Sequence, residues 1–288
     1  MPTQKRASAA GADQRSGITA GGAGAPRSGP RNDGNWPAVR LTVAECYSVA
    51  RQARGGGFLY TETVSDRLGT AVAAVGMRLG VHPTYLTLVN LILGIGGSVA
   101  VIAGRSADRV TPIVAAGAVL WQVAYIFDCA DGQLARATGK TSIYGGSVDV
   151  FADVAVQISV VAAVSSIILS RHEAPALLLV IFASAWYLNF VTFLLAKGQD
   201  QASHSLATRR SALVSVAKLL RDYGFVILLL GAWLLASPST LLVPVMAVTA
   251  MNLLLLAAWT ARAARLSIRV SASSQTADHA PRDGSSHA

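Results

Sequence analysis

Charged residues and cysteines are both scarce in this sequence of 288 residues. Charged side chains make up 14% of it and hydrophobic ones 52%, a balance too apolar for an ordinary soluble domain. The two cysteines, Cys46 and Cys129, cannot form a disulfide framework, and neither lies in a Cys-x-x-Cys or Cys/His cluster. The five histidines also lack the spacing of metal ligands. The composition therefore predicts a membrane protein.

The net charge of +9 raises the question of a nucleic-acid partner. The basic residues, however, are spread through the tails and the loops between apolar runs. This distribution favours anionic lipid headgroups over nucleic acid. We therefore expect the lipid bilayer as a partner and no nucleic acid.

Large apolar side chains are nearly absent from residues 1–40, which are rich in Gly, Ala, Ser, Pro and Arg. Such a segment cannot bury enough surface to fold, so we predict a disordered N-terminal tail. It also lacks the continuous apolar stretch of a signal peptide, so the first span should act as an uncleaved insertion signal. A transit peptide fits less well, because the arginines lack amphipathic spacing. Residues 270–288 are predicted to form a second disordered tail.

Two helices are predicted within residues 41–80. The first begins with the capping-box pattern Thr42-Val43-Ala44-Glu45 and ends before the glycines at 55–57. In the second, apolar residues recur at helical spacing: Val64, Leu68, Val72, Val75 and Leu79. This pattern is typical of an amphipathic helix lying on the membrane surface. A helix packed on a small soluble domain is the alternative, but the remaining sequence contains no such domain.

Six apolar runs follow within residues 81–269, each near the ~20 residues that cross a bilayer. They cover residues 84–103, 110–137, 145–169, 175–196, 217–236 and 241–261. The sequence thus predicts an all-α, polytopic membrane protein with six transmembrane helices, preceded by a juxtamembrane amphipathic helix. The second run exceeds the length that ~30 Å of hydrocarbon requires, so its end at 128–136 should emerge into the headgroup layer.

The basic residues also predict an orientation. If the N-terminus is cytoplasmic, the inside segments contain Arg136, Lys140, Lys197, Arg209, Arg210, Lys218, Arg221, Arg262, Arg265 and Arg269. The outside loops contain only Arg105, Arg109 and Arg171. The positive-inside rule then places both termini, and the end of the second run, on the cytoplasmic side of the cell membrane.

Four carboxylates lie in and between the second and third runs. Asp128 and Asp131 are three residues apart, and Asp149 and Asp153 are four apart, so each pair should project from one face of a helix. Four acids close together in a membrane protein repel one another and are costly to desolvate. Divalent cations would neutralise them, so all four are candidate metal ligands. Ion or proton transport is the alternative use of such acids.

Small residues accompany these acids. Gly132 and Ala135 fall within roughly 100° of Asp128 on a helical wheel, and Gly145 lies one turn before Asp149. A groove between two helices could therefore form beside the carboxylates. Arg136 lies near this groove and offers a fixed positive charge suited to phosphate oxygens.

The same residues resemble the signature of the CDP-alcohol phosphatidyltransferases, D-x2-D-G-x2-A-R-x8-G-x3-D-x3-D. Every specified position matches: Asp128, Asp131, Gly132, Ala135, Arg136, Gly145, Asp149 and Asp153. The resemblance implies that a CDP-linked lipid, most often CDP-diacylglycerol, binds over two divalent ions, Mg2+ or Mn2+, held by the four aspartates. Its phosphatidyl group would pass to an alcohol with release of CMP, in phospholipid biosynthesis. A homodimer is also implied.

The resemblance further implies roles for individual residues. Asp153 would accept the proton of the alcohol, and Asp149 would raise its basicity. Gly132 and Ala135 would form the cytidine slot, and Arg136 would hold the diphosphate or orient the acids. The segment His82-Pro83-Thr84-Tyr85-Leu86-Thr87 resembles the family's Pro-Asn-x-x-Thr segment, which makes Thr84 and Thr87 candidate cytidine neighbours. Alternatively, Pro83 only starts a helix and Thr87 bonds to its own backbone.

The acceptor is less well defined by sequence. Members that use a phosphorylated acceptor commonly have Arg or Lys after the final aspartate, and this chain has Val154. We infer a mild preference for an acceptor without a phosphate. Two other functions stay open: transfer of a headgroup from a soluble CDP-alcohol to a lipid hydroxyl, and ion-coupled transport. Transporters usually contain an internal repeat, and we find no convincing one here.

Several other polar and small residues have two possible roles. We expect Gly94, Gly96 and Gly97 to allow close helix packing and not to form a dinucleotide loop. Gln157 either contacts a metal-bound water or substrate, or makes an interhelical hydrogen bond. Asn252 is expected to make such a bond. Residues 197–218 are either a lip over the site or a solvated connector.

Overall fold

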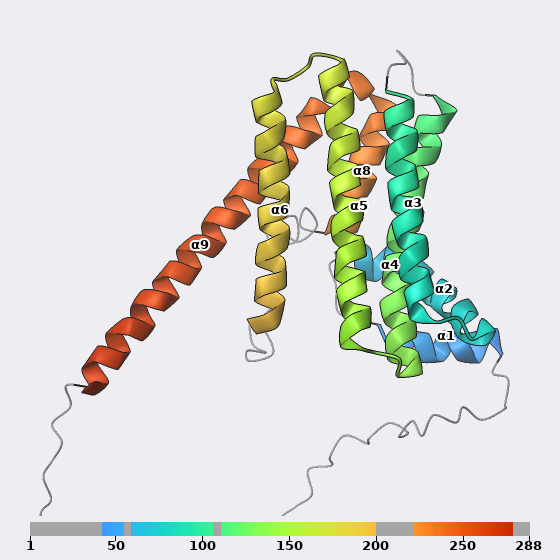
Figure 1. Cartoon of the computed structure of the whole chain (residues 1–288), viewed down its shortest axis with the longest axis horizontal. Coiled ribbons are helices and arrows are strands. Elements are labelled where there is room, and N and C mark those ends of the chain that lie inside the picture. The colour runs from blue at the N-terminus through green and yellow to red at the C-terminus, as the bar shows by residue number, and fades with distance from the viewer. Residues whose placement is uncertain (1–41, 55–58, 106–110, 200–221, 279–288) are drawn as a thin grey trace, which may run out of the picture. The chain divides into compact units, whose positions relative to one another are not determined.

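The computed structural model describes residues 42–54, 59–105, 111–199 and 222–278. These residues form helices joined by short turns, and none of them lies in a strand, which confirms the all-α prediction (Figure 1). The predicted tail at 1–40 and most of the predicted lip at 197–218 lie outside the described residues.

Helix α1 (Val43–Gln52) begins with the predicted capping box. The Glu45 carboxylate accepts a hydrogen bond from the Thr42 backbone N–H at 2.7 Å, and the Glu45 N–H donates to Thr42 Oγ1 at 3.3 Å. These bonds satisfy backbone donors that a helix N-terminus otherwise leaves unpaired. The Glu45 carboxylate accepts a further hydrogen bond from Thr42 Oγ1 at 2.9 Å. The two bonds that it accepts from Thr42 favour its charged form and lower the pKa of Glu45.

The predicted amphipathic helix begins with a π-helical turn, η1 (Thr61–Ser65), which leads into α2 (Asp66–Leu79). Gly80 ends α2 in the left-handed conformation, with φ of 69°. The buried face of α2 consists mainly of small residues, whereas Leu68, Val75 and Leu79 are exposed. An apolar stripe that the protein leaves uncovered is suited to a membrane surface and not to the core of a soluble domain.

Each apolar run appears as a helix within the described residues. These helices are α3 (Pro83–Ala103), α4 (Pro112–Thr138), α5 (Ile143–Ser170), α6 (Ala176–Gln199), α8 (Tyr223–Ala236) and α9 (Leu242–Asp278), with a short 3-10 helix at Pro238–Thr240. Proline occupies the first position of both α3 and α4, where its missing N–H costs no hydrogen bond. Side chains of His82, Thr111 and Ser142 cap α3, α4 and α5.

Four of these helices are long and apolar enough to cross a membrane within the described residues: 83–103, 112–138, 143–170 and 238–265. The stretches at 176–192 and 223–236 are apolar but shorter, so the count of six spans stays a prediction. Helix α9 continues to Asp278, so residues 270–278, which the sequence assigns to the tail, are helical. They follow a segment rich in Ala and Arg and contain no Gly or Pro, so nothing local ends the helix.

Helix α3 packs against both α4 and α5 (Figure 1). A Cβ on Gly97 would lie 2.8 Å from the Gly117 carbonyl oxygen of α4, and a Cβ on Gly94 would lie 2.6 Å from Val156 of α5. The close-packing prediction is therefore confirmed for Gly94 and Gly97. It is wrong for Gly96, because a Cβ there would meet nothing within 4 Å.

Polar side chains inside the bundle bond between helices. Trp186 Nε1 donates to Gln157 Oε1 at 2.9 Å, and Asn189 Nδ2 donates to Asn252 Oδ1 at 2.9 Å. The interhelical alternative is thus the one observed for Gln157, and the prediction for Asn252 is confirmed. Buried polar groups must find partners within the protein where water is absent, and these pairs satisfy that need.

Candidate metal centre and its surroundings

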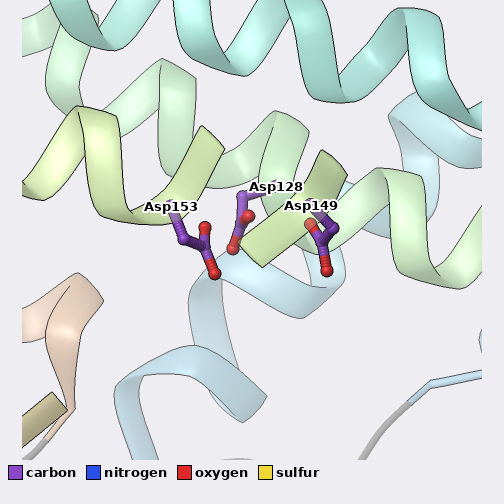
Figure 2. Close-up of side chains that lie close together, drawn as sticks. All are labelled: Asp128, Asp149 and Asp153. Atoms are coloured by element: carbon purple, nitrogen blue, oxygen red, sulfur yellow. The ribbon is translucent and has the colours of Figure 1, made fainter. Parts of the chain in front are cut away.

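Three of the four predicted carboxylates come together between α4 and α5. Asp128 of α4 and both Asp149 and Asp153 of α5 each offer one oxygen, and these oxygens all lie within 4.8 Å of one another (Figure 2). We call these three residues the acid cluster. Asp149 and Asp153 share one face of α5 because they are one turn apart, as the spacing predicts.

The turn between α4 and α5 places the acid cluster at one end of the two helices. Gly139 ends α4 with φ of 66°, a left-handed conformation that glycine adopts without strain. Ser142 then caps α5 by accepting a hydrogen bond from Gly145 N–H at 2.9 Å. Through this hydrogen bond Gly145 has a local role in starting α5. Helices α1 and α2 lie at this same end of the bundle (Figure 1).

Asp131, the fourth predicted ligand, is not part of the acid cluster. It is 4% exposed, and its carboxylate accepts a hydrogen bond from Thr87 Oγ1 of α3 at 2.5 Å. Asp131 still lies close enough to Asp128 and Asp149 to interact with them electrostatically. The Thr87 hydroxyl therefore bonds to an acid of the signature, which neither of the two predicted roles for Thr87 included.

Asn90 is a second α3 residue at the site, and sequence reasoning missed it. It is 2% exposed, and its Nδ2 donates to Asp128 Oδ1 at 3.3 Å. Thr87 and Asn90 are three residues apart, so they project from the same face of α3. The sequence did contain a signal for Asn90, because two polar residues three positions apart within an apolar run indicate a polar helix face. Helix α3 thus contacts both aspartates of α4 through neutral donors.

Arg136 and Gly132 lie beside each other on α4. Arg136 Nε donates to the Ala53 carbonyl, just past the end of α1, at 2.7 Å. Its Nη1 lies 3.1 Å from the point that a Cβ on Gly132 would occupy, so glycine leaves room for the guanidinium. Gly132 is one turn from Asp128 on α4. The Arg136 guanidinium, which lies beside Gly132, therefore places positive charge near the acid cluster. Ala135 and Thr84, the other predicted contacts, are partly exposed.

A polar network next to these residues joins α2 to α4. Gln133 Nε2 donates to Asp66 Oδ1 at 3.1 Å, and Thr70 Oγ1 donates to Gln133 Oε1 at 2.9 Å. Arg54 Nε also donates to Thr70 Oγ1 at 2.8 Å. Burial raises the pKa of Asp66, while the Gln133 hydrogen bond and the charges of Arg54 and Arg136 oppose this rise. The network holds α2 on the part of α4 that contains Arg136.

A cavity of about 10 Å³ adjoins the acid cluster. Its lining residues are Asn90, Trp121, Tyr125, Asp128, Asp153, Val156 and Tyr223. Asp128 and Asp153 thus contribute to both the acid cluster and the cavity. The volume is near the minimum for a single water molecule, so at most one small group fits.

The acid cluster has the chemistry of a divalent-cation site. Its three ligand groups are carboxylates, the hard oxygen donors that Mg2+ and Mn2+ prefer. Like charges within 4.8 Å of one another repel, and a cation between them would offset that repulsion. The donor set therefore fits the predicted metal, and its identity as Mg2+ or Mn2+ stays a prediction.

Comparison with known proteins identifies the family. The model of the CDP-alcohol phosphatidyltransferase family matches residues 80–258, which is more than half of the chain. The chain therefore belongs to this family. The matched region contains the acid cluster and every residue of the signature. A search of curated proteins finds no match. The family implies transfer of a phosphatidyl group from a CDP-alcohol in phospholipid synthesis, and this favours an enzyme over an ion transporter.

Proposed function

We propose that this protein is a divalent-metal-dependent enzyme that moves a phosphatidyl group from CDP-diacylglycerol to an alcohol and releases CMP. The observation that carries the proposal is the acid cluster, in which α4 and α5 bring three signature carboxylates within 4.8 Å of one another. Membership of the family supplies the reaction class. We further propose that the enzyme works as a homodimer in the cell membrane, with both termini and the acid cluster facing the cytoplasm.

The metal would be held by the acid cluster, with Asp131 as a further ligand or as a neighbour that adds negative charge. When bound, Mg2+ or Mn2+ supplies electrostatic stabilisation of the charge that develops on the transferred phosphate and on CMP. The Thr87 and Asn90 hydrogen bonds hold Asp131 and Asp128 in place for this role. Such fixed ligand orientation is what neighbouring hydrogen bonds provide at metal sites.

The reaction itself is a displacement at phosphorus. The oxygen of the acceptor alcohol forms a bond to the phosphorus of the phosphatidyl group, and the bond from that phosphorus to the CMP oxygen breaks. CMP leaves with the electron pair of that bond, and Asp153 accepts the proton of the alcohol. Asp149 lies one turn away on α5, and its negative charge makes Asp153 a better base.

The remaining signature residues would bind the donor. Gly132 and Ala135 would form the cytidine slot, and Gly145 would border it at the start of α5. Arg136 has its Nε–H engaged by Ala53, while its Nη groups lie over Gly132 and are positioned for diphosphate oxygens. Thr84 lies at the start of α3, three residues before Thr87, and would contact the nucleotide from that side.

Val154, after the last aspartate, favours an acceptor without a phosphate. The second candidate function, headgroup transfer from a soluble CDP-alcohol to a lipid hydroxyl, uses the same signature. Purified protein incubated with labelled CDP-diacylglycerol, and separately with labelled CDP-choline or CDP-ethanolamine, would distinguish the two. A panel of polyols, amino alcohols and phosphorylated polyols, read by mass spectrometry of the lipid product, would identify the acceptor.

The decisive variant is Asp128→Asn, assayed by CMP release with Mg2+ or Mn2+. We expect activity to fall by at least about 10³-fold, because a charged ligand that stabilises the transition state is lost. Glu173→Gln is the matched control, since it makes the same carboxylate-to-amide change just beyond the opposite end of α5. We expect the control to retain wild-type activity. Unchanged CMP release by purified Asp128→Asn would refute the proposed function.

A further inference from the structure

The hydroxyl of Tyr223 is buried and has no hydrogen-bond partner within the described part of the chain. Tyr223 is the first residue of α8, and its side chain lines the cavity together with Asp128 and Asp153. Buried side-chain polar atoms in folded proteins almost always have a partner. An unpaired hydroxyl beside the acid cluster therefore indicates a group that binds in the cavity during the reaction.

The position of Tyr223 is fixed by its neighbours. Asp222, which is fully buried, accepts hydrogen bonds from Thr61 N–H at 2.8 Å and Thr61 Oγ1 at 2.7 Å, so the start of α8 is tied to η1. The Tyr223 ring packs edge-to-face on Tyr125, with centroids 5.4 Å apart, and on Trp186, at 6.1 Å. The ring is therefore held between α4 and α6 before any ligand binds.

The other groups around the cavity define what can bind there. Tyr125 OH is paired with Thr61 Oγ1 at 2.8 Å, and Asn90 already donates to Asp128. The Tyr223 hydroxyl is therefore the group left to satisfy, and the Asp153 carboxylate lines the same cavity. A carboxylate can accept several hydrogen bonds, so a ligand atom that accepts from the phenol and donates to a carboxylate suits this cavity, and a hydroxyl group does both. A phosphate is excluded by the small volume.

We propose that Tyr223 binds the reacting hydroxyl of the acceptor alcohol, donating a hydrogen bond to its oxygen and so orienting it beside Asp153. The inference rests on the proposed function and adds to it a residue outside the family signature, contributed by a fourth helix, α8. Only the hydroxyl enters the cavity, and the rest of the acceptor stays outside. A single water molecule could make the same hydrogen bonds in the cavity. The experiment distinguishes a bound water from the acceptor hydroxyl.

The test is Tyr223→Phe, which removes one oxygen and keeps the packed ring. With CDP-diacylglycerol, Mg2+ and the acceptor identified by the panel, we expect kcat/KM for the acceptor to fall about tenfold. The KM for CDP-diacylglycerol should change by less than about twofold, because the proposal places Tyr223 against the acceptor and not against the nucleotide. The thermal unfolding temperature should stay the same or rise, since the substitution removes no hydrogen bond within the described part of the chain. Tyr47→Phe, on the exposed side of α1, is the matched control and should match wild type throughout.

Each result decides the inference. Unchanged kcat/KM for the acceptor in Tyr223→Phe would overturn it, as would an equal loss for acceptor and donor. Without acceptor, water attacks CDP-diacylglycerol and gives CMP and phosphatidic acid. If Tyr223→Phe slows this hydrolysis but leaves transfer to the acceptor unchanged, Tyr223 holds only a water molecule. That result would also overturn the inference. The two failures can be told apart. If the wild-type protein releases no CMP, the proposed function is refuted. If the wild type is active and Tyr223→Phe is unaffected, only the inference about Tyr223 fails.

Discussion

Helix α4 faces α3 and α5 in opposite ways. Against α3 it forms a close contact through Gly97 and Gly117, and a Cβ on either glycine would lie under 3 Å from the other's carbonyl oxygen. Toward α5 it presents Asp128, whose carboxylate faces Asp149 and Asp153 (Figure 2). We call the first contact the glycine seam. The protein itself fills the space at the glycine seam, whereas at the acid cluster like charges face one another and a bound cation would complete the contact.

The largest expected effect is the response of the acid cluster to metal. A cation that binds only the folded protein adds about 2.7 kcal/mol to its free energy of unfolding at a hundredfold excess over Kd. We therefore expect Mg2+ to raise the thermal unfolding temperature relative to EDTA, and Asp149→Asn to abolish this rise. In EDTA the variant should be at least as stable as wild type, because one repelling charge is gone.

Glu173→Gln is again the matched control and should keep the Mg2+ response of wild type. If Asp149→Asn keeps the same response, the cation binds elsewhere and the contrast between the acid cluster and the glycine seam fails.

The next effect concerns the glycine seam. In Gly97→Ala the new Cβ would lie 2.8 Å from the Gly117 carbonyl oxygen and 3.0 Å from the Trp121 ring, so backbone must shift. Overpacking of this kind costs about 1–3 kcal/mol, and we expect a lower unfolding temperature with Mg2+ stabilisation retained.

Gly96→Ala is the matched control for the glycine seam, because it is the adjacent residue on α3 and a Cβ there meets nothing within 4 Å. It should be neutral or stabilising by up to about 1 kcal/mol, since alanine is the better helix former. Equal destabilisation by both substitutions would show that the close contact does not depend on the missing Cβ.

The smallest effect comes from Asp66, which lies outside the acid cluster. Asp66 has a hydrogen-bond donor, Gln133, and nearby positive charges within the protein. Burial raises its pKa above the ordinary value of 3.8, so the folded protein holds this proton more tightly than the unfolded chain does. Its contribution to stability is therefore fully present below 3.8 and is lost as the pH rises through the raised pKa. Arg54 and Arg136 limit this loss, and Glu62 adds to it.

Asp66→Asn has no proton to lose and can still accept the hydrogen bond from Gln133. The difference in unfolding temperature between variant and wild type should thus be near zero at pH 3.8 and grow in favour of the variant as pH increases. Contributions from the acid cluster cancel in this difference. A difference that shrinks with increasing pH would contradict the assigned direction of the pKa shift.

Local patterns in the sequence predicted much of the fold. Thr42 and Glu45 predicted the start of α1, and the apolar runs predicted the helices, because capping and periodicity depend on residues within a few positions of one another. The four-residue spacing of Asp149 and Asp153 likewise predicted their shared face. The end of α9 was predicted too early, since composition alone marks the end of a membrane run but not of a helix.

Contacts between helices were harder to predict. Thr87 bonds to Asp131, and Arg136 bonds to the carbonyl of Ala53, and these pairs are separated by 44 and 83 positions. Asn90 and Tyr223 reach the site from α3 and α8, outside the signature. Spacing along one helix shows which face a residue occupies, but it does not show which other helix covers that face.

The sequence by itself determined that the chain is helical and apolar, that it contains the family's acidic signature, and that two of its aspartates share a helix face. These properties depend on neighbouring residues and on composition. Only the tertiary structure decided that Asp128 joins Asp149 and Asp153 while Asp131 bonds to Thr87, and that the Tyr223 hydroxyl is buried beside the acid cluster. The packing of α3 and α8 around α4 and α5 sets these contacts, and that packing depends on the shapes of all four helices together.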